Sequence, residues 1–95
     1  MAYCVVHHFK GGTQEQYEAL APVVYPPDGS LLPGELFEAA GASADGWVVI
    51  SVFDSKERYE SFLNERLVPA IGQVGDRGFA GSPDEWAYEA VVIKR

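Results

Sequence analysis

The sequence predicts an α+β domain in which a four-stranded antiparallel sheet carries two helices on one face. Residues 3–9 and 47–53 are apolar at both odd and even positions, which is typical of strands covered on both sides. Residues 13–25 and 54–71 place apolar side chains at three- and four-residue steps, which is typical of helices with one buried stripe. A chain of 95 residues has enough helix for one face only, so the other face is expected to meet a second copy.

The first helix has clear start and stop signals. Gly11 and Gly12 turn the chain after the first strand, and Thr13 with Gln16 matches a capping box. The apolar stripe that follows ends near Tyr25, because the two prolines after it cannot continue a helix.

The remaining elements follow from turn residues and apolar runs. The second helix is expected to begin at a cap within residues 54–57 and to end near Ile71, with Pro69 bending or fraying its last turn. The other expected segments are a loop at 26–34, a strand at 36–40, a connection at 41–46, a central strand at 47–53, a Gly-rich acidic segment at 72–85 and a last strand at 86–94.

The predicted order is therefore strand, helix, strand, strand, helix, strand. This is the split βαβ pattern of the ferredoxin-like fold, and residues 1–95 form one such domain. Two of these sheets paired through their bare faces give a dimeric α/β barrel, so we expect a homodimer.

The composition indicates which kinds of binding partner the protein can have. The net charge is −7 and the seven Lys and Arg are scattered, which disfavours nucleic acid and anionic membranes. No apolar run approaches the roughly 18 residues that a membrane span needs, and the N-terminus does not resemble a signal peptide, so a cytoplasmic protein is expected. The lone Cys4 is expected to be a small core residue in a reducing compartment. A neutral or weakly acidic, largely apolar ligand suits this charge balance.

Two histidines are the main candidates for proton chemistry. His7 and His8 are consecutive in a strand, so they face opposite sides of the sheet and cannot serve one site together. We expect His7, which shares its side with Val5 and Phe9, to be the pocket residue and a general base. The same position also suits a structural, hydrogen-bonded histidine. Two histidines on opposite faces and one cysteine do not make a metal site.

Glu38 is the second catalytic candidate. A carboxylate in the middle of a strand lies either on an exposed face or in a pocket that raises its pKa. If it shares a cavity with a histidine, the two can act as a base and its orienting partner.

Polar aromatic residues are the candidates for ligand contact. They serve either as core and interface residues or as the wall of a pocket for a flat aromatic ligand. No nucleophile elbow, P-loop or dinucleotide-binding motif is present. The predicted substrate-binding residues are Tyr17, Trp47, His8, Tyr25 and Leu32.

Turn and cap residues along nearly the whole chain carry a family resemblance. They are residues 9–17, 33–34, 39–41, 45–47 and 54–57. With these motifs the chain resembles the dimeric α/β barrels of the antibiotic-biosynthesis-monooxygenase-like superfamily, especially its small actinobacterial-type members of unassigned function. In this subfamily a histidine often stands at the place of Glu38, so the chain departs from the pattern there.

The resemblance implies an enzyme that oxidises an apolar aromatic or polyketide-type molecule without metal or organic cofactor. His7 or Glu38 would remove a phenolic or benzylic proton, the carbanion would reduce dioxygen, and Tyr17 and Trp47 would stabilise the developing oxyanion. Two alternatives stay open: cyclisation or isomerisation of a polyketide-like substrate, and a non-catalytic dimeric binding or stress-associated protein. Haem degradation is disfavoured, because the relatives that degrade haem hold it with a helical histidine and neither expected helix contains one.

Overall fold

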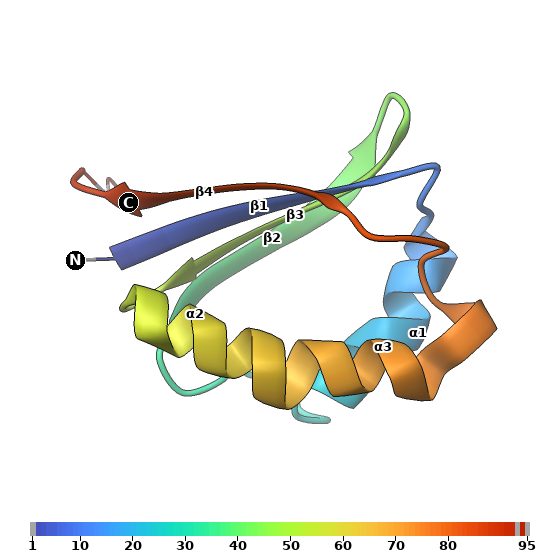
Figure 1. Cartoon of the computed structure of the whole chain (residues 1–95), viewed down its shortest axis with the longest axis horizontal. Helices are drawn as coiled ribbons and strands as arrows, with labels where there is room; N and C mark the ends of the chain where they lie inside the picture. The colour runs from blue at the N-terminus through green and yellow to red at the C-terminus, as the bar shows by residue number, and fades with distance from the viewer. Residues whose placement is uncertain (1, 93, 95) are drawn as a thin grey trace.

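An antiparallel sheet with strand order β2-β3-β1-β4 forms one layer of the molecule, and helices form the other (Figure 1). The computed structural model describes residues 2–92 and 94. This architecture confirms the predicted α+β class and the ferredoxin-like order of elements, with β1 and β3 as the central pair. The strands are β1 (Ala2–Lys10), β2 (Glu35–Ser43), β3 (Gly46–Phe53) and β4 (Asp84–Ala90).

Helix α1 (Gln14–Val24) begins at the predicted capping box. The Thr13 hydroxyl accepts from the Gln16 amide at 3.2 Å, and the Gln16 side chain accepts from the Thr13 amide at 3.0 Å. Leu20 and Val24 on the predicted stripe are buried in a core cluster with Leu32, Ala70 and Val74.

The second helical segment extends further than expected. It consists of α2 (Lys56–Phe62), the π-helical turn η1 (Leu63–Leu67) and α3 (Val68–Val74), which is followed by the 3-10 turn η2 (Gly75–Arg77). The helix does not fray at Pro69, because α3 continues through Val74. The irregular turn lies just before this residue, at the π-helical Leu63–Leu67, where the proline ring would collide with the carbonyl of Glu65 in a regular α-helix.

The connection between β2 and β3 is shorter than predicted. Strand β2 continues through Ser43, so that only Ala44 and Asp45 link it to β3, instead of residues 41–46. Gly41 and Ala42 look like turn residues in the sequence. They pair with Val48 and Trp47 of β3, so the sheet ladder continues through both residues.

The last strand is displaced toward the N-terminus relative to the predicted range 86–94. It begins at Asp84 and ends at Ala90, which pairs with Ala2 at the start of β1. Val91 and Val92 lie outside β4 and are largely exposed, and Ile93 lies outside the described residues. The apolar run at 91–93 therefore placed the predicted strand later in the chain than the sheet pairing does.

One face of the sheet is packed against the helices, and the other is not. On the helical face, Val5 and Phe53 are each only 1% exposed and pack around Tyr59 of α2. Figure 1 shows no helix on the other face. Its larger apolar residues, assigned from the strand register, are Cys4, Val6, Phe37, Val48, Ile50, Val52, Trp86 and Tyr88.

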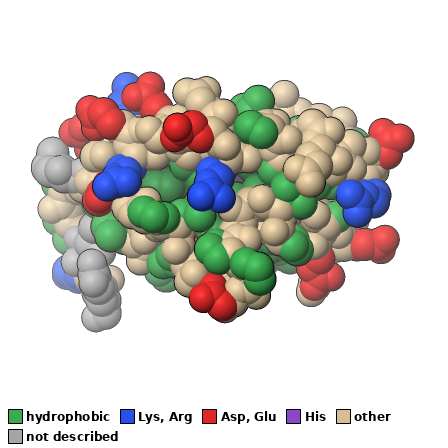
Figure 2. Space-filling model, turned by 90° about the horizontal axis from the view of Figure 1, so that it is seen from below, with side chains coloured by type: hydrophobic (Ala, Val, Ile, Leu, Met, Phe, Trp, Pro, Cys, Tyr) green, Lys and Arg blue, Asp and Glu red, His purple; other side chains and the backbone are tan. Residues whose placement is uncertain are grey.

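The helical side of the molecule is seen in Figure 2. Its acidic and basic side chains are scattered over the surface and apolar patches lie between them. None of the helices within residues 2–92 is long and apolar enough to span a membrane.

The close contact of Gly46 with β1 gives a stability prediction. An added Cβ at Gly46 would lie 2.1 Å from the backbone oxygen of Phe9, and both residues belong to paired strands. We expect Gly46→Ala to lower the free energy of unfolding by about 2 kcal/mol, measured by urea denaturation. The matched control is Gly72→Ala in α3, where no atom lies within 4 Å and the helix should gain about 0.5–1 kcal/mol. Equal effects of the two substitutions would contradict the register of β1 and β3.

Candidate active site

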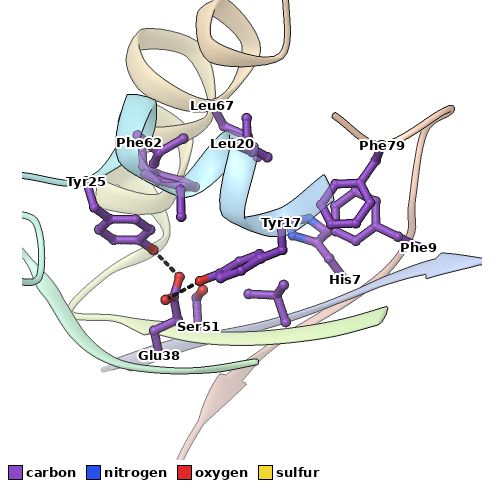
Figure 3. A pocket seen from close by; sticks show the side chains of 13 residues that line it. His7, Phe9, Tyr17, Leu20, Tyr25, Glu38, Ser51, Phe62, Leu67 and Phe79 are labelled. Carbon is purple, nitrogen blue, oxygen red and sulfur yellow. Dashed lines mark hydrogen bonds between the residues drawn. The ribbon is translucent and has the colours of Figure 1, made fainter. Parts of the chain in front are cut away.

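A cavity lies between α1, the second helical segment and the helical face of the sheet (Figure 3). Its volume is about 40 Å³, and about 430 Å³ when all free space up to and including its open mouth is counted. A cavity of about 40 Å³ holds about two or three water molecules, so a flat aromatic ligand would have to displace side chains or extend into the open solvent beside it. The wall consists of His7, Phe9, Tyr17, Leu20, Ala21, Val24, Tyr25, Glu38, Val49, Ser51, Phe62, Leu67 and Phe79.

His7 lines the cavity and forms a hydrogen-bonded cluster with two residues that do not line it. Its Nε2 lies 2.8 Å from Oε2 of Glu85 and 3.2 Å from the hydroxyl of Tyr59. The register of β1 and β4 places His7 opposite Glu85, and Tyr59 reaches them from α2. His7 and Tyr59 are both buried, whereas the Glu85 side chain is 43% exposed.

The hydrogen bonds determine which nitrogen of His7 carries the proton. Tyr59 donates its single hydroxyl proton to Glu85 at 2.6 Å, so the carboxylate accepts its second hydrogen bond from Nε2–H of His7. Within residues 2–92 no side chain is bonded to Nδ1. In this tautomer Nδ1 carries a lone pair, so His7 has one basic nitrogen that none of these hydrogen bonds occupies.

The electrostatics of this cluster favour an ionised Glu85. The hydrogen bond from Tyr59 lowers the pKa of Glu85, partial burial raises it, and the hydrogen bond and charge of His7 lower it, so that the pKa lies below its ordinary value. Burial and the adjacent Glu85 carboxylate raise the pKa of Tyr59 well above its ordinary value, which keeps that hydroxyl protonated.

Glu38 belongs to a second cluster in the same wall. Tyr17 donates to its Oε1 at 2.7 Å, and Tyr25 makes a close hydrogen bond to its Oε2. Figure 3 shows the carboxylate between these two hydroxyls, with His7 farther along the wall beyond Tyr17. Burial, followed by the hydrogen bonds to Glu38, raises the pKa of both tyrosines well above the ordinary value.

Glu38 and His7 therefore face one cavity but have different partners. No hydrogen bond joins them among the residues that the structure describes. The carboxylate that orients His7 is Glu85. Glu38 is instead available as a second titratable group facing the cavity.

The other predicted site residues lie elsewhere. Trp47 is buried beneath Tyr17, with ring centroids 5.4 Å apart, and does not line the cavity. Its Nε1 is the one buried side-chain polar atom without a hydrogen-bond partner within the described range. Leu32 packs in the core cluster around Leu20 and borders a different cavity, between residues 32–33 and the second helical segment.

His8 lies on the opposite face of the sheet from the cavity. Its Nε2 is 2.9 Å from Asp45 and 3.4 Å from the hydroxyl of Ser43, and its Nδ1 is 3.8 Å from Asp84. This places it at the rim of the uncovered face, in a separate polar cluster.

Three polar residues of the site are not evident from the sequence. Glu85 and Tyr59 bind His7, and Glu35 lies behind Glu38 through a shared hydrogen bond to Tyr25. Glu85 was part of a segment expected to be loop, and its contact with His7 spans 78 positions. A strand register for β1 and β4 would have found it, because it predicts which residue of β4 lies opposite His7.

Residues 2–92 and 94 contain no cluster of three or more His, Cys, Asp or Glu side chains arranged to bind a metal ion. The chemistry that these residues offer is proton transfer. It combines an oriented imidazole with a carboxylate that accepts two tyrosine hydroxyls.

Comparison with known proteins supports the fold. No family model and no curated protein matches the chain. Among solved structures, the chain is similar to a proposed antibiotic biosynthesis monooxygenase from Chloroflexus aurantiacus J-10-fl, with a TM-score of 0.69 and 18% sequence identity. The match covers 100% of this chain and 98% of the other. At this level of identity the similarity shows a shared fold.

The His7–Glu85 contact predicts a specific tautomer. We expect ¹⁵N NMR of the imidazole to show the proton on Nε2 of His7 in the wild-type protein, because Glu85 accepts it. Glu85→Ala should give a mixture of tautomers. The signal of His8, on the other face of the sheet, is the internal control and should change little. A wild-type His7 with the proton on Nδ1 would contradict the proposed orientation of the ring.

Proposed function

We propose that the protein is a cofactor-independent monooxygenase-like enzyme that acts on an apolar phenolic or polyketide-type small molecule. The observation that carries the proposal is the position of His7, which lies in an otherwise largely apolar cavity wall with Nε2 held by Glu85. An imidazole oriented by a carboxylate is the arrangement that general-base catalysis requires. The shared fold with a proposed antibiotic biosynthesis monooxygenase supports the same reaction class.

The proposed reaction begins with proton abstraction. Nδ1 of His7 removes a proton from a benzylic carbon of the bound substrate, and the Glu85 carboxylate stabilises the resulting imidazolium. The carbanion reduces dioxygen and forms a carbon–oxygen bond, which gives a peroxide anion. The imidazolium returns the proton to that anion, and the hydroperoxide loses water to leave a ketone. The substrate and dioxygen together give the ketone and water, so the reaction needs no added reductant.

The remaining wall residues support substrate orientation. Phe9 and Phe79 stack with ring centroids 3.8 Å apart at the His7 end of the cavity, and Phe62 lies on its helical side. Aromatic side chains of this kind suit a flat apolar ligand. The hydroxyl of Tyr17 lies at the same wall and is a hydrogen-bond donor that could turn toward a substrate oxygen.

Cyclisation or isomerisation of a polyketide-type substrate is the second candidate. The observation that favours it is the presence of two separate proton-binding groups in one wall, His7 and Glu38. A base and an acid at two positions on a substrate suffice for an aldol-type ring closure, which needs no oxygen.

Oxygen uptake separates these reactions. Metal-stripped protein is tested with anthrones, hydroquinones and polyphenols, and we expect uptake that survives chelation. His7→Ala should lower kcat/KM by about 100-fold or more, because a general base contributes at least this factor. His8→Ala is the matched control and should keep near wild-type activity, since His8 lies on the opposite face. Uptake that persists in His7→Ala would exclude His7 as the base. No uptake by a folded wild-type protein would leave cyclisation or simple binding.

We also propose that a second copy of the chain covers the uncovered sheet face. Phe37, Trp86 and Tyr88 on this face are more than half exposed in the single chain. They lie beside the half-buried Val48 and Ile50 of the central strand, so the apolar surface is continuous across the sheet. Apolar faces of this extent commonly belong to interfaces, and a two-fold pair would bury the same residues on both chains.

Substitution at this face tests the dimer. We expect sedimentation velocity to show a dimer for the wild type and mainly monomer for Trp86→Asp, because a charge would be buried at the interface. Ile71→Asp is the matched control, because Ile71 is similarly exposed on α3 on the opposite side of the molecule. A monomeric wild type, or equal dissociation by both variants, would contradict the proposed interface.

A further inference from the structure

Glu35 is a buried acid with no part in the reaction proposed above. It is 6% exposed, at the start of β2. Its Oε2 lies 2.8 Å from the hydroxyl of Tyr25, and its Oε1 accepts a long hydrogen bond of 3.4 Å from the amide of Leu32. A buried carboxylate with only one strong donor is costly, so its protonation state needs a structural explanation.

The hydrogen bonds around Tyr25 require one more proton than two ionised carboxylates provide. The Tyr25 hydroxyl contacts both Glu35 and Glu38, but a phenol has a single proton to donate. With both carboxylates ionised, one of the two contacts would bring together two acceptors. One additional proton on either carboxyl group removes this conflict.

The surroundings favour Glu35 as the holder of this proton. Glu38 is less buried and has both Tyr17 and Tyr25 as hydroxyl partners, which stabilise its ionised form. Burial raises the pKa of Glu35, and so does the charge of Glu38, whereas the hydrogen bonds from Tyr25 and Leu32 lower it. Burial is the largest of these effects, so the pKa of Glu35 lies above its ordinary value.

A basic side chain close to this region is bound elsewhere. Arg58 of α2 lies against Gly34, beside Glu35, but its ion contact is with Asp54 at 3.7 Å. Glu35 therefore has a tyrosine and a backbone amide as partners, and no side-chain cation is bonded to it within residues 2–92.

We propose that Glu35 is the proton store of the site and that Tyr25 and Glu38 connect it to the cavity. The hydrogen bonds then run in one direction: Glu35 donates to Tyr25, Tyr25 donates to Glu38, and Tyr17 donates to the other oxygen of Glu38. The role in catalysis rests on the proposed function. The extra proton itself rests only on the hydrogen-bond geometry.

Proton transfer along this chain is balanced. The proton of Glu35 moves to the Tyr25 oxygen while the Tyr25 proton moves to Glu38, so that two O–H bonds break and two form. Glu35 becomes ionised and Glu38 becomes the acid that faces the cavity. Glu38 then gives the proton to a basic atom of the bound molecule. His7 and Glu38 would thus act as base and acid on one substrate.

Infrared spectroscopy of the protein without substrate tests the stored proton. At about pH 6, nearly two units above the ordinary glutamate pKa of about 4.3, exposed carboxyl groups are almost fully ionised. We expect the carbonyl stretch of a protonated carboxyl group in the wild type and its loss in Glu35→Gln. Gln retains an N–H donor toward Tyr25, so this variant should keep the fold, as checked by circular dichroism. Glu57→Gln, on the exposed side of α2, is the matched control and should keep the band.

The outcomes separate this proposal from the proposed function. A band that is absent in the wild type, or that survives in Glu35→Gln, overturns the proton store whether or not the protein is an enzyme. A band lost only with Glu35 supports the store even if no substrate is turned over. If turnover is found, Glu35→Gln should lower kcat by about 10-fold or more with little change in KM, because it affects proton delivery and leaves the wall unchanged. Tyr25→Phe, which interrupts the chain, should reproduce this loss.

Discussion

The two-residue alternation of β1 is the constraint on which the site depends. Because β1 is central, its helical face carries Val5, His7 and Phe9 into the core, and its other face carries Cys4, Val6 and His8. A shift of register by one residue would exchange the two histidines between faces and turn the buried Val5 and Phe9 outward. The burial of these apolar residues therefore holds His7 in the cavity wall and opposite Glu85 on β4.

Most of the polar side chains brought into this small core lie in two separate hydrogen-bonded clusters, and the Nε1 of Trp47 stands outside both. His7, Tyr59 and Glu85 form one, and the second joins Tyr17 and Tyr25 to the carboxyl groups of β2. Such networks are expensive to bury unless every donor finds an acceptor, and replacing them by apolar residues would be simpler for stability alone. Both clusters reach the same cavity, one through His7 and the other through Tyr17, Tyr25 and Glu38, which is the arrangement that the proposed proton transfer requires.

Local signals predicted much of the fold but less of the site. The capping box at Thr13, the helical stripes and the strand runs depend on neighbouring residues, and each lies close to where the sequence places it. The ends of β2 and β4 depend on pairing with other strands, which local composition does not report. Local composition also does not reveal the contacts of Glu85 and Glu35. Glu85 binds His7, which is distant in the chain, and Glu35 is connected to Glu38 through Tyr25. The facing of His7 was predictable from alternation, whereas its orienting carboxylate was not.

The most direct test of His7 as the base is hydrogen exchange at an acidic carbon, measured without oxygen. Anthrone in deuterated buffer is incubated anaerobically with the protein, and loss of the benzylic proton signal is followed by ¹H NMR. If His7 removes that proton, the wild type accelerates exchange and His7→Ala does not, while His8→Ala behaves like the wild type. This step precedes both oxygenation and cyclisation, so it is independent of the later chemistry. Equal exchange by the wild type and His7→Ala would contradict the assignment of His7 as the base.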